Sequence, residues 1–398
     1  MEHKTRIKGN VHYVGVNDRN KHRFEGMWPL PYGVSYNSYL IDDEMVALVD
    51  TVDICYFEVY LRKIKQVIGE RPINYLIINH MEPDHSGSIR LIKQHYPEII
   101  IVGNKQTFGM IEGFYGVTGE QYLVKEGDFL ALGHHKLRFY MTPMVHWPET
   151  MMTFDETDGV LFSGDGFGCF GTVDGGFLDT RINVDKYWGE MVRYYSNIVG
   201  KYGSPVQKAL QKLGGLPISA ICSTHGPVWT ENIAKVIGIY DRLSRYDADE
   251  GVVIAYGSMY GNTEQMAEAI AEELSAQGVK NIVMHNVTKS HPSYIIADIF
   301  RYKGLIIGSP TYSNQIFPKV EALLSKILLR EVKGRYLGYF GSFTWAGAAV
   351  KRLAEFAEKS KFELVGDPVE MKQAMKDLTY TQCENLARAM ADRLKKDR

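Results

Sequence analysis

The feature that most constrains this chain is a dense run of metal-binding side chains, His80-Met81-Glu82-Pro83-Asp84-His85. The run follows the apolar stretch 73–79 (INYLIIN), whose length and β-branched content predict a buried strand. Four potential ligands within six residues form a compact loop at the carboxyl end of that strand. Because α/β sheets place their binding sites at the carboxyl ends of strands, we expect a layered α/β domain built around a metal site.

Three further candidate ligands occur later in the chain, again where an apolar run ends. They are His146 in TPMVHWPE, Asp165 in LFSGDGFG and His225 in STHGP. A single histidine in such a place is usually structural, and Asp165 also suits a Gly-Asp-Gly turn. Together with the loop, however, they supply four imidazoles and three carboxylates. That is enough for two metal ions with three terminal ligands each and one bridging carboxylate.

The ligand types narrow the choice of metal. The chain has four cysteines, none in a CxxC pair and none in the cluster, which argues against iron–sulfur, rubredoxin-type and disulfide frameworks. Imidazoles with several carboxylates suit iron or manganese, and zinc also accepts this mixture. The ligand set alone favours iron over zinc and leaves both open.

The order of apolar runs predicts two domains. Strands and helices interleave through the first part, including a long helical stretch over about 186–213. The segment 241–250 (DRLSRYDADE) is charged and has no long apolar run, so we expect domains at 1–248 and 249–398. After it, continuous apolar strands alternate with amphipathic helices, which predicts a doubly wound parallel sheet. These strands are expected at 251–257, 281–287, 303–310 and 336–343.

Three loops of the second domain follow such strands and predict a mononucleotide pocket. The first is rich in hydroxyls and glycine and opens a helix, an arrangement that can cradle a phosphate. It lacks GxGxxG, so a mononucleotide is favoured over a dinucleotide. The other two place aromatic residues among small polar ones, as a flat, partly polar ring requires. The loops consist of Ser258, Met259, Tyr260, Gly261, Asn262 and Thr263, of Ser309, Pro310, Thr311, Tyr312, Ser313 and Asn314, and of Ser342, Phe343, Thr344, Trp345, Ala346 and Gly347.

Charge and hydropathy exclude several classes of protein. The formal net charge is −2, which carries no electrostatic signature of a nucleic-acid or membrane-surface binder. No apolar run reaches the length of about 20 residues that a membrane-spanning helix needs. The start, MEHKTRIKGN, lacks the apolar core of a signal peptide. We expect a cytoplasmic protein.

The metal motif resembles that of the metallo-β-lactamase fold, an αββα sandwich whose hydrolases typically carry HxHxDH at this loop. Glu82 in place of the second histidine is similar to the flavodiiron proteins (A-type flavoproteins), and the second half resembles flavodoxin. The resemblance implies FMN in the three loops and two iron ions. It implies one iron on His80, Glu82 and His146, the other on Asp84, His85 and His225, and a bridge through Asp165.

The same resemblance implies an oxidoreductase that reduces O2 to water, NO to nitrous oxide, or both. It also implies a head-to-tail homodimer or a tetramer, in which the FMN of one subunit serves the diiron site of the other. Because the chain ends at Arg398, soon after the last flavodoxin helix, we expect a separate electron donor. The family suggests rubredoxin, with a reduced deazaflavin as the alternative.

Residues around the irons are less defined by the sequence. Family members often carry Phe-His-Gly near the N-terminus, whereas this chain has Phe24-Glu25-Gly26 with His22 nearby. Tyr195 is expected either to line the same pocket or to be a packed helix aromatic. A zinc-dependent lactamase-type hydrolase with a flavodoxin passenger is the main alternative, and Glu82 argues against it. A second alternative is a flavin-binding electron carrier with a vestigial metal domain. The complete set of seven ligands argues against it.

Overall fold

The computed structural model describes residues 4–397, which form two compact units that divide between Ser244 and Arg245. This division lies inside the charged segment 241–250; the domain boundary expected after residue 248 stays a prediction. Each unit has its own sheets and its own hydrophobic core.

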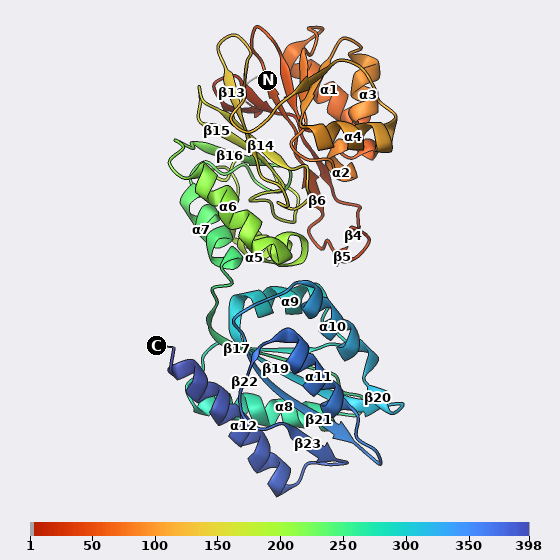
Figure 1. The fold of residues 1–398 in the computed structure, drawn as a ribbon, viewed down its shortest axis with the longest axis vertical. Helices are drawn as coiled ribbons and strands as arrows, with labels where there is room; N and C mark the ends of the chain where they lie inside the picture. The colour runs from red at the N-terminus through yellow and green to blue at the C-terminus, as the bar shows by residue number, and fades with distance from the viewer. Residues whose placement is uncertain (1–3, 398) are drawn as a thin grey trace. The chain divides into compact units, whose positions relative to one another are not determined.

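The first unit is built on two packed β-sheets (Figure 1). Tyr39 and Ile77 of one sheet share a buried cluster with Phe139 and Phe162 of the other, so the core lies between the sheets. In spatial order the first sheet is β1 (Arg6–Lys8), β2 (Val11–Tyr13), β7 (Tyr39–Ile41), β8 (Ala47–Val49), β9 (Tyr75–Ile77), β10 (Ile100–Gly103) and β11 (Gln121–Leu123). The second is β12 (Phe129–Ala131), β13 (Lys136–Met141), β14 (Met151–Asp155), β15 (Val160–Gly164) and β16 (Ala220–Ser223). Two short pairs are β3 (Val16–Asp18) with β6 (Val34–Tyr36), and β4 (Arg23–Phe24) with β5 (Trp28–Pro29).

Helices cover the outer sides of these sheets, with α1 to α4 on one side and α5 to α7 on the other (Figure 1). Helix α1 shows why: Phe57, Tyr60, Ile64 and Ile68 recur at helical spacing and are its buried residues. The helices are α1 (Phe57–Ile68), α2 (Pro83–Ser86), α3 (Ile89–His95), α4 (Lys105–Tyr115), α5 (Asp185–Tyr194), α6 (Gly203–Leu213) and α7 (Ile233–Ser244).

The long helical stretch expected over about 186–213 is present in the structure, but the type of helix changes along it. Helix α5 runs into a π-helical turn, Tyr195–Val199, and then a 3-10 turn, Gly200–Tyr202, before α6 begins. Pro205 lies in the first turn of α6, where its missing N–H and fixed φ are tolerated, whereas a helix interior would lose a hydrogen bond there. The helical stretch was therefore predicted correctly, and the changes of helix type within it were not predicted.

Strand direction positions the site. Strands β8, β9, β10 and β11 run parallel, and β15 runs parallel to β16. The loop that follows β9 and those that follow β15 and β16 leave at carboxyl ends of strands, where converging side chains can meet.

The second unit is a doubly wound parallel sheet in the order β18-β17-β19-β21-β22, with β23 also beside β21 and β20 paired antiparallel to β19. Helices α8 and α12 lie on one face, and α9, α10 and α11 on the other (Figure 1). The strands are β17 (Asp249–Tyr256), β18 (Ile282–Asn286), β19 (Tyr302–Tyr312), β20 (Gln315–Ile316), β21 (Tyr336–Phe343), β22 (Glu363–Leu364) and β23 (Val369–Lys372). The helices are α8 (Asn262–Ala276), α9 (Pro292–Arg301), α10 (Pro318–Leu329), α11 (Ala349–Ser360) and α12 (Asp377–Lys395).

The expected fold class, a sandwich followed by a flavodoxin-like sheet, is confirmed. Within residues 4–397, every helix is too short or too polar to cross a bilayer.

Candidate functional site

The structure brings the seven candidate metal ligands together at strand ends of the first unit. The loop after β9 supplies four of them, the loop between β13 and β14 one, and the segments after β15 and β16 one each. All seven are buried, with exposed fractions of at most 9%. They are His80, Glu82, Asp84, His85, His146, Asp165 and His225.

The carboxylate of Asp165 presents its two oxygens to different imidazoles. Oδ2 lies 3.0 Å from His146 Nε2 and 3.7 Å from His80 Nε2. Oδ1 lies 3.2 Å from His85 Nε2 and 3.4 Å from His225 Nε2. This is the geometry of a carboxylate that bridges two neighbouring cation positions.

The other two carboxylates complete the two halves of the cluster. Glu82 Oε2 lies 3.2 Å from His146 Nε2 and 3.7 Å from His80 Nε2. Asp84 lies 3.2 Å from His225 Nε2 through Oδ2 and 3.5 Å from His85 Nε2 through Oδ1. Ligands at about 2.0–2.2 Å from a metal stand about 3 Å from one another at right angles. The observed spacings are therefore those of atoms arranged around ions.

Several of these atoms are buried without a hydrogen-bond partner. They include Nε2 of His80, both oxygens of Asp84, both ring nitrogens of His85 and Nε2 of His225. A buried polar atom left unsatisfied costs about 1–3 kcal/mol, and more when it is charged. The cluster therefore fits metal ions, which would satisfy these atoms at once.

Two of the imidazoles are oriented by a contact at Nδ1, the ring nitrogen that faces away from the cluster. His225 Nδ1–H donates to the carbonyl oxygen of Ser35 at 2.8 Å, so its Nε2 lone pair faces the cluster. His80 Nδ1 lies 2.6 Å from Glu149 Oε1. The sequence analysis missed Glu149, because nothing in the segment after His146 indicates which distant histidine it meets.

The electrostatics of the cluster favour a cation. Burial opposes charge on His85, but Asp84 and Asp165 raise its pKa to about 10. Burial would also raise the pKa of Asp165, but the imidazoles around it, His85 foremost, hold that pKa well below its usual value. Glu82 behaves likewise: the neighbouring imidazoles, His146 foremost, outweigh burial and lower its pKa. Asp165 and Glu82 are therefore held ionised in a buried site.

A cavity of about 560 Å³ opens beside the cluster, with Glu82 and Asp84 in its wall. Phe24, Glu25 and Tyr115 also line it. Because one ligand of each half is in the wall, a small molecule in this cavity would reach both cation positions.

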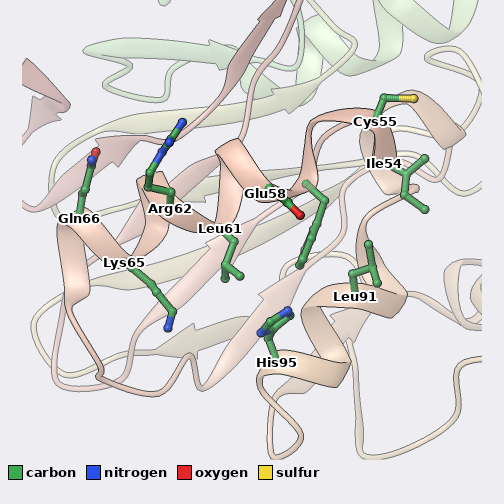
Figure 2. A pocket seen from close by; sticks show the side chains of 10 residues that line it. Ile54, Cys55, Glu58, Leu61, Arg62, Lys65, Gln66, Leu91 and His95 are labelled. Atoms are coloured by element: carbon green, nitrogen blue, oxygen red, sulfur yellow. The ribbon is translucent and has the colours of Figure 1, made fainter.

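A larger hollow of about 980 Å³ lies between α1 and α3 (Figure 2). Leu61 and Leu91 form apolar parts of its wall, and Arg62 and Lys65 are charged parts. None of the seven candidate ligands lines this hollow, although Ile54 and Leu91 line both hollows.

Of the three residues expected near the metals, Glu25 lines the cavity, whereas His22 and Tyr195 do not. Glu25 has a φ of +49° and accepts a hydrogen bond of 2.8 Å from Trp28 Nε1–H. His22 is exposed and is not in the cavity wall. Tyr195 packs on Tyr240, with ring centres 5.1 Å apart.

The neighbouring Tyr194, unlike Tyr195, contacts a ligand of the cluster. Its ring centre lies 5.7 Å from that of His225, and its hydroxyl is buried without a hydrogen-bond partner. Consecutive helical residues point about 100° apart, so Tyr194 and Tyr195 cannot share one direction. Tyr195 therefore has the packing of one of the two expected alternatives, a helix aromatic, whereas Tyr194 lies beside a ligand of the cluster.

The three loops of the second unit surround a cavity of about 390 Å³. Five residues of each predicted loop line it; Gly261, Ser309 and Gly347 do not. Two aromatic side chains at its rim, Tyr260 and Trp345, are 92% and 81% exposed. This is an open slot with apolar walls that suits a flat ring.

The phosphate end of the pocket is the N-terminus of α8. Gly261, with a φ of +90°, precedes the helix, and no side chain caps it. Ser258 Oγ accepts the Gly261 N–H at 3.2 Å, and the hydroxyls of Thr263 and Ser342 lie 2.8 Å apart. The uncapped helix start and nearby hydroxyls fit a phosphate. Gln373, which follows β23, also lines the pocket and was missed, because only its hydrogen bond to Phe343 O brings it there.

Comparison with known families agrees with both halves. The profile of the ODP family beta lactamase matches residues 34–226, and that of flavodoxin matches residues 254–386.

Two curated relatives are similar over most of the chain. An anaerobic nitric oxide reductase flavorubredoxin of Vibrio vulnificus is 33% identical over 363 residues, 90% of this chain and 73% of that protein. One of Escherichia coli is 32% identical over 364 residues, 90% of this chain and 76% of that protein.

Solved structures are similar over nearly the whole chain. The rubredoxin oxygen:oxidoreductase of Desulfovibrio gigas has a TM-score of 0.93 and 31% identity, covering 97% of both chains. The flavodiiron protein of Giardia intestinalis has a TM-score of 0.91 and 26% identity, covering 98% of this chain and 97% of that one.

Proposed function

We propose that this chain, which belongs to the flavodiiron protein family, is an oxidoreductase that reduces oxygen, nitric oxide or both. It does so with a diiron centre in the first unit and FMN in the second. The observation that carries the proposal is Asp165, whose two oxygens face two separate sets of buried imidazoles.

The donor set assigns the cofactors. We assign one iron to His80, Glu82 and His146, the other to Asp84, His85 and His225, and Asp165 to both. FMN takes the second pocket, with its phosphate at residues 258–263 and its ring between 309–314 and 342–347. When bound, the irons and the flavin supply one-electron and two-electron redox chemistry that amino-acid side chains lack.

The residues of the chain prepare the site for a small molecule. The carbonyl of Ser35 holds the His225 proton on Nδ1, which leaves Nε2 for metal. The cavity beside Glu82 and Asp84 admits a diatomic molecule. The hydroxyl of Tyr194 is buried without a hydrogen-bond partner and its ring lies beside His225, so we propose that it donates to a molecule held at the metal centre.

Exposed apolar surface supports a head-to-tail homodimer. Tyr260 and Trp345 are exposed at the flavin pocket, and Ile54, at the cavity beside the metals, is 54% exposed. Contiguous exposed apolar groups around a binding site usually mark a surface that a partner covers. A dimer that joins these two surfaces would bury both and bring FMN to the centre of the other subunit.

The electron donor is proposed from the relatives. A solved relative is named rubredoxin oxygen:oxidoreductase, and we propose a separate rubredoxin as donor, with reduced deazaflavin as the alternative. A cytoplasmic location stays a prediction.

The first test is the metal and flavin content of the purified protein, followed by anaerobic reduction and rapid mixing with oxygen or nitric oxide. We expect about two irons and one FMN per chain and fast flavin reoxidation by at least one gas. The faster gas identifies the preferred substrate. Two zinc ions with a slowly reoxidising flavin would overturn the proposal and support the hydrolase.

A further inference from the structure

We infer that Glu149 is a positioning residue for His80, and that its charge makes the two iron positions unequal in redox potential. The inference rests on the proposed diiron function and concerns a residue that supplies no ligand atom.

The contact between the two side chains is short and fully buried. Glu149 Oε1 lies 2.6 Å from His80 Nδ1, and both side chains are 0% exposed. The same oxygen accepts the backbone N–H of Met81 at 2.9 Å. Since a carboxylate accepts, His80 carries its proton on Nδ1 and turns Nε2 toward the cluster. Glu149 therefore sets both the tautomer and the direction of this imidazole.

The backbone holds Glu149 in place. Its carbonyl oxygen accepts a hydrogen bond of 2.5 Å from Asn104 Nδ2, and Asn104 also caps α4 through its side-chain oxygen. The second carboxylate oxygen, Oε2, is buried without a partner. The charge of Glu149 is therefore directed at His80 and Met81 through hydrogen bonds.

The metal ligands themselves do not distinguish the two positions. Each half has two imidazoles, one carboxylate of its own and one oxygen of Asp165. The partners behind the imidazoles do differ. His225 has the neutral carbonyl of Ser35, and Nδ1 of His85 has no hydrogen-bond partner.

A carboxylate behind an imidazole pulls on its Nδ1 proton and makes Nε2 a stronger electron donor. An iron bound to His80 is therefore stabilised in its ferric form relative to the iron bound to His225. With iron bound, the position held by His225 would be the easier of the two to reduce, and the position held by His80 the harder. The charge of Glu149 would thereby widen the range of potential over which only one of the two positions is reduced.

The test compares Glu149→Gln with a matched control, Asp155→Asn. Asp155 Oδ2 lies 2.9 Å from His135 Nδ1, and both residues are at most 1% exposed, so the control also removes the charge of a buried histidine–carboxylate pair. This pair lies at the far end of β14 from Met151, whose N–H donates to Asn79 next to the ligand loop.

Two readouts besides activity are used on the full-length holoprotein. One is potentiometric titration followed by iron-57 Mössbauer spectroscopy, which does not detect the flavin. The other is iron retention against a chelator. For Glu149→Gln we expect the ferrous-to-ferric ratio at the His80 position to rise about tenfold at fixed potential, a shift of ~59 mV for one electron, so the half-reduced form declines. We also expect iron to bind about 10–100-fold more weakly.

Asp155→Asn is expected to match the wild type in both readouts. If Glu149→Gln does not fold, Glu149→Asp keeps the charge and lengthens the contact, and it should weaken iron retention without abolishing the half-reduced form. If Glu149→Gln titrates like the wild type, the inference is overturned. An equal change in the Asp155→Asn control would overturn it too. Either outcome would leave the diiron function intact. A wild type that binds no iron would instead remove the proposed function itself.

Discussion

Within the metal centre, the two oxygens of Asp165 face different pairs of imidazoles, so both cation positions share one side chain. An amide offers one acceptor and one donor, and the donor cannot bind a cation. We expect Asp165→Asn to lose at least half of the iron of the wild type. Elemental analysis measures this, and the flavin absorbance of the same sample is the internal control. Unchanged iron content would show that Asp165 does not bridge.

Two adjacent tyrosines offer a matched pair of variants at the residue scale. Tyr194 contacts His225, whereas Tyr195 packs on Tyr240. If the Tyr194 hydroxyl hydrogen-bonds a molecule held at the centre, Tyr194→Phe removes about 1–1.5 kcal/mol and slows turnover by about tenfold. Tyr195→Phe should turn over at the wild-type rate. Stopped-flow reoxidation compares the two, and equal rates for both variants would exclude the role of Tyr194.

At the scale of elements, helix α8 carries a positive-φ glycine at each end. Gly261 at its start and Gly278 just past its end have φ near +90° and +87°, and both have open space where a side chain would go. Alanine in this region costs about 1–2 kcal/mol. Because only the start of the helix meets the phosphate, Gly261→Ala should bind FMN about tenfold more weakly, whereas Gly278→Ala should bind it normally. Fluorescence titration of the flavin-free protein measures both, and equal affinities would place the phosphate elsewhere.

His135 ties the start of β13 to the end of β14 through Asp155. Burial lowers the pKa of His135, but the hydrogen bond that its Nδ1–H donates to Asp155 outweighs burial and raises the pKa above its usual value. A raised folded-state pKa stabilises the fold below the unfolded pKa, and the contribution is lost as the pH rises through the folded value. His135→Gln should therefore melt several degrees below the wild type at pH 6, and the gap should narrow by pH 9. Thermal scans of both proteins test this, and a gap that widens with pH would contradict it.

At the scale of the whole molecule, the proposed dimer predicts that two defective chains can restore one another. Asp165→Asn lacks the metal bridge, and Asn262→Glu, at the exposed start of α8, places a negative charge against the FMN phosphate. Each variant alone should be inactive. After mixing and subunit exchange, a dimer that pairs FMN and irons between subunits should regain about a quarter of the wild-type rate. No recovery, with exchange shown independently, would mean that each chain works alone.

The sequence by itself determined the fold class, the candidate ligands and the three flavin loops. It could do so because these features are local: buried strands appear as apolar runs, and binding side chains follow their carboxyl ends. His80 to His85 form one loop, and the phosphate loop directly precedes its helix. The pairing of the ligands into two halves was implied only by the family resemblance, and the contacts that agree with it appear in the structure.

The tertiary structure alone decided which residues support the ligands. Glu149 meets His80 across 69 positions and Ser35 meets His225 across 190, and no local pattern encodes such contacts. Gln373 reaches the flavin pocket only because β23 aligns with β21. Tyr194 rather than Tyr195 faces the cluster because the direction of a helical side chain depends on how the whole helix packs. Local chemistry thus indicated what this protein binds, and long-range packing set how each bound group is held.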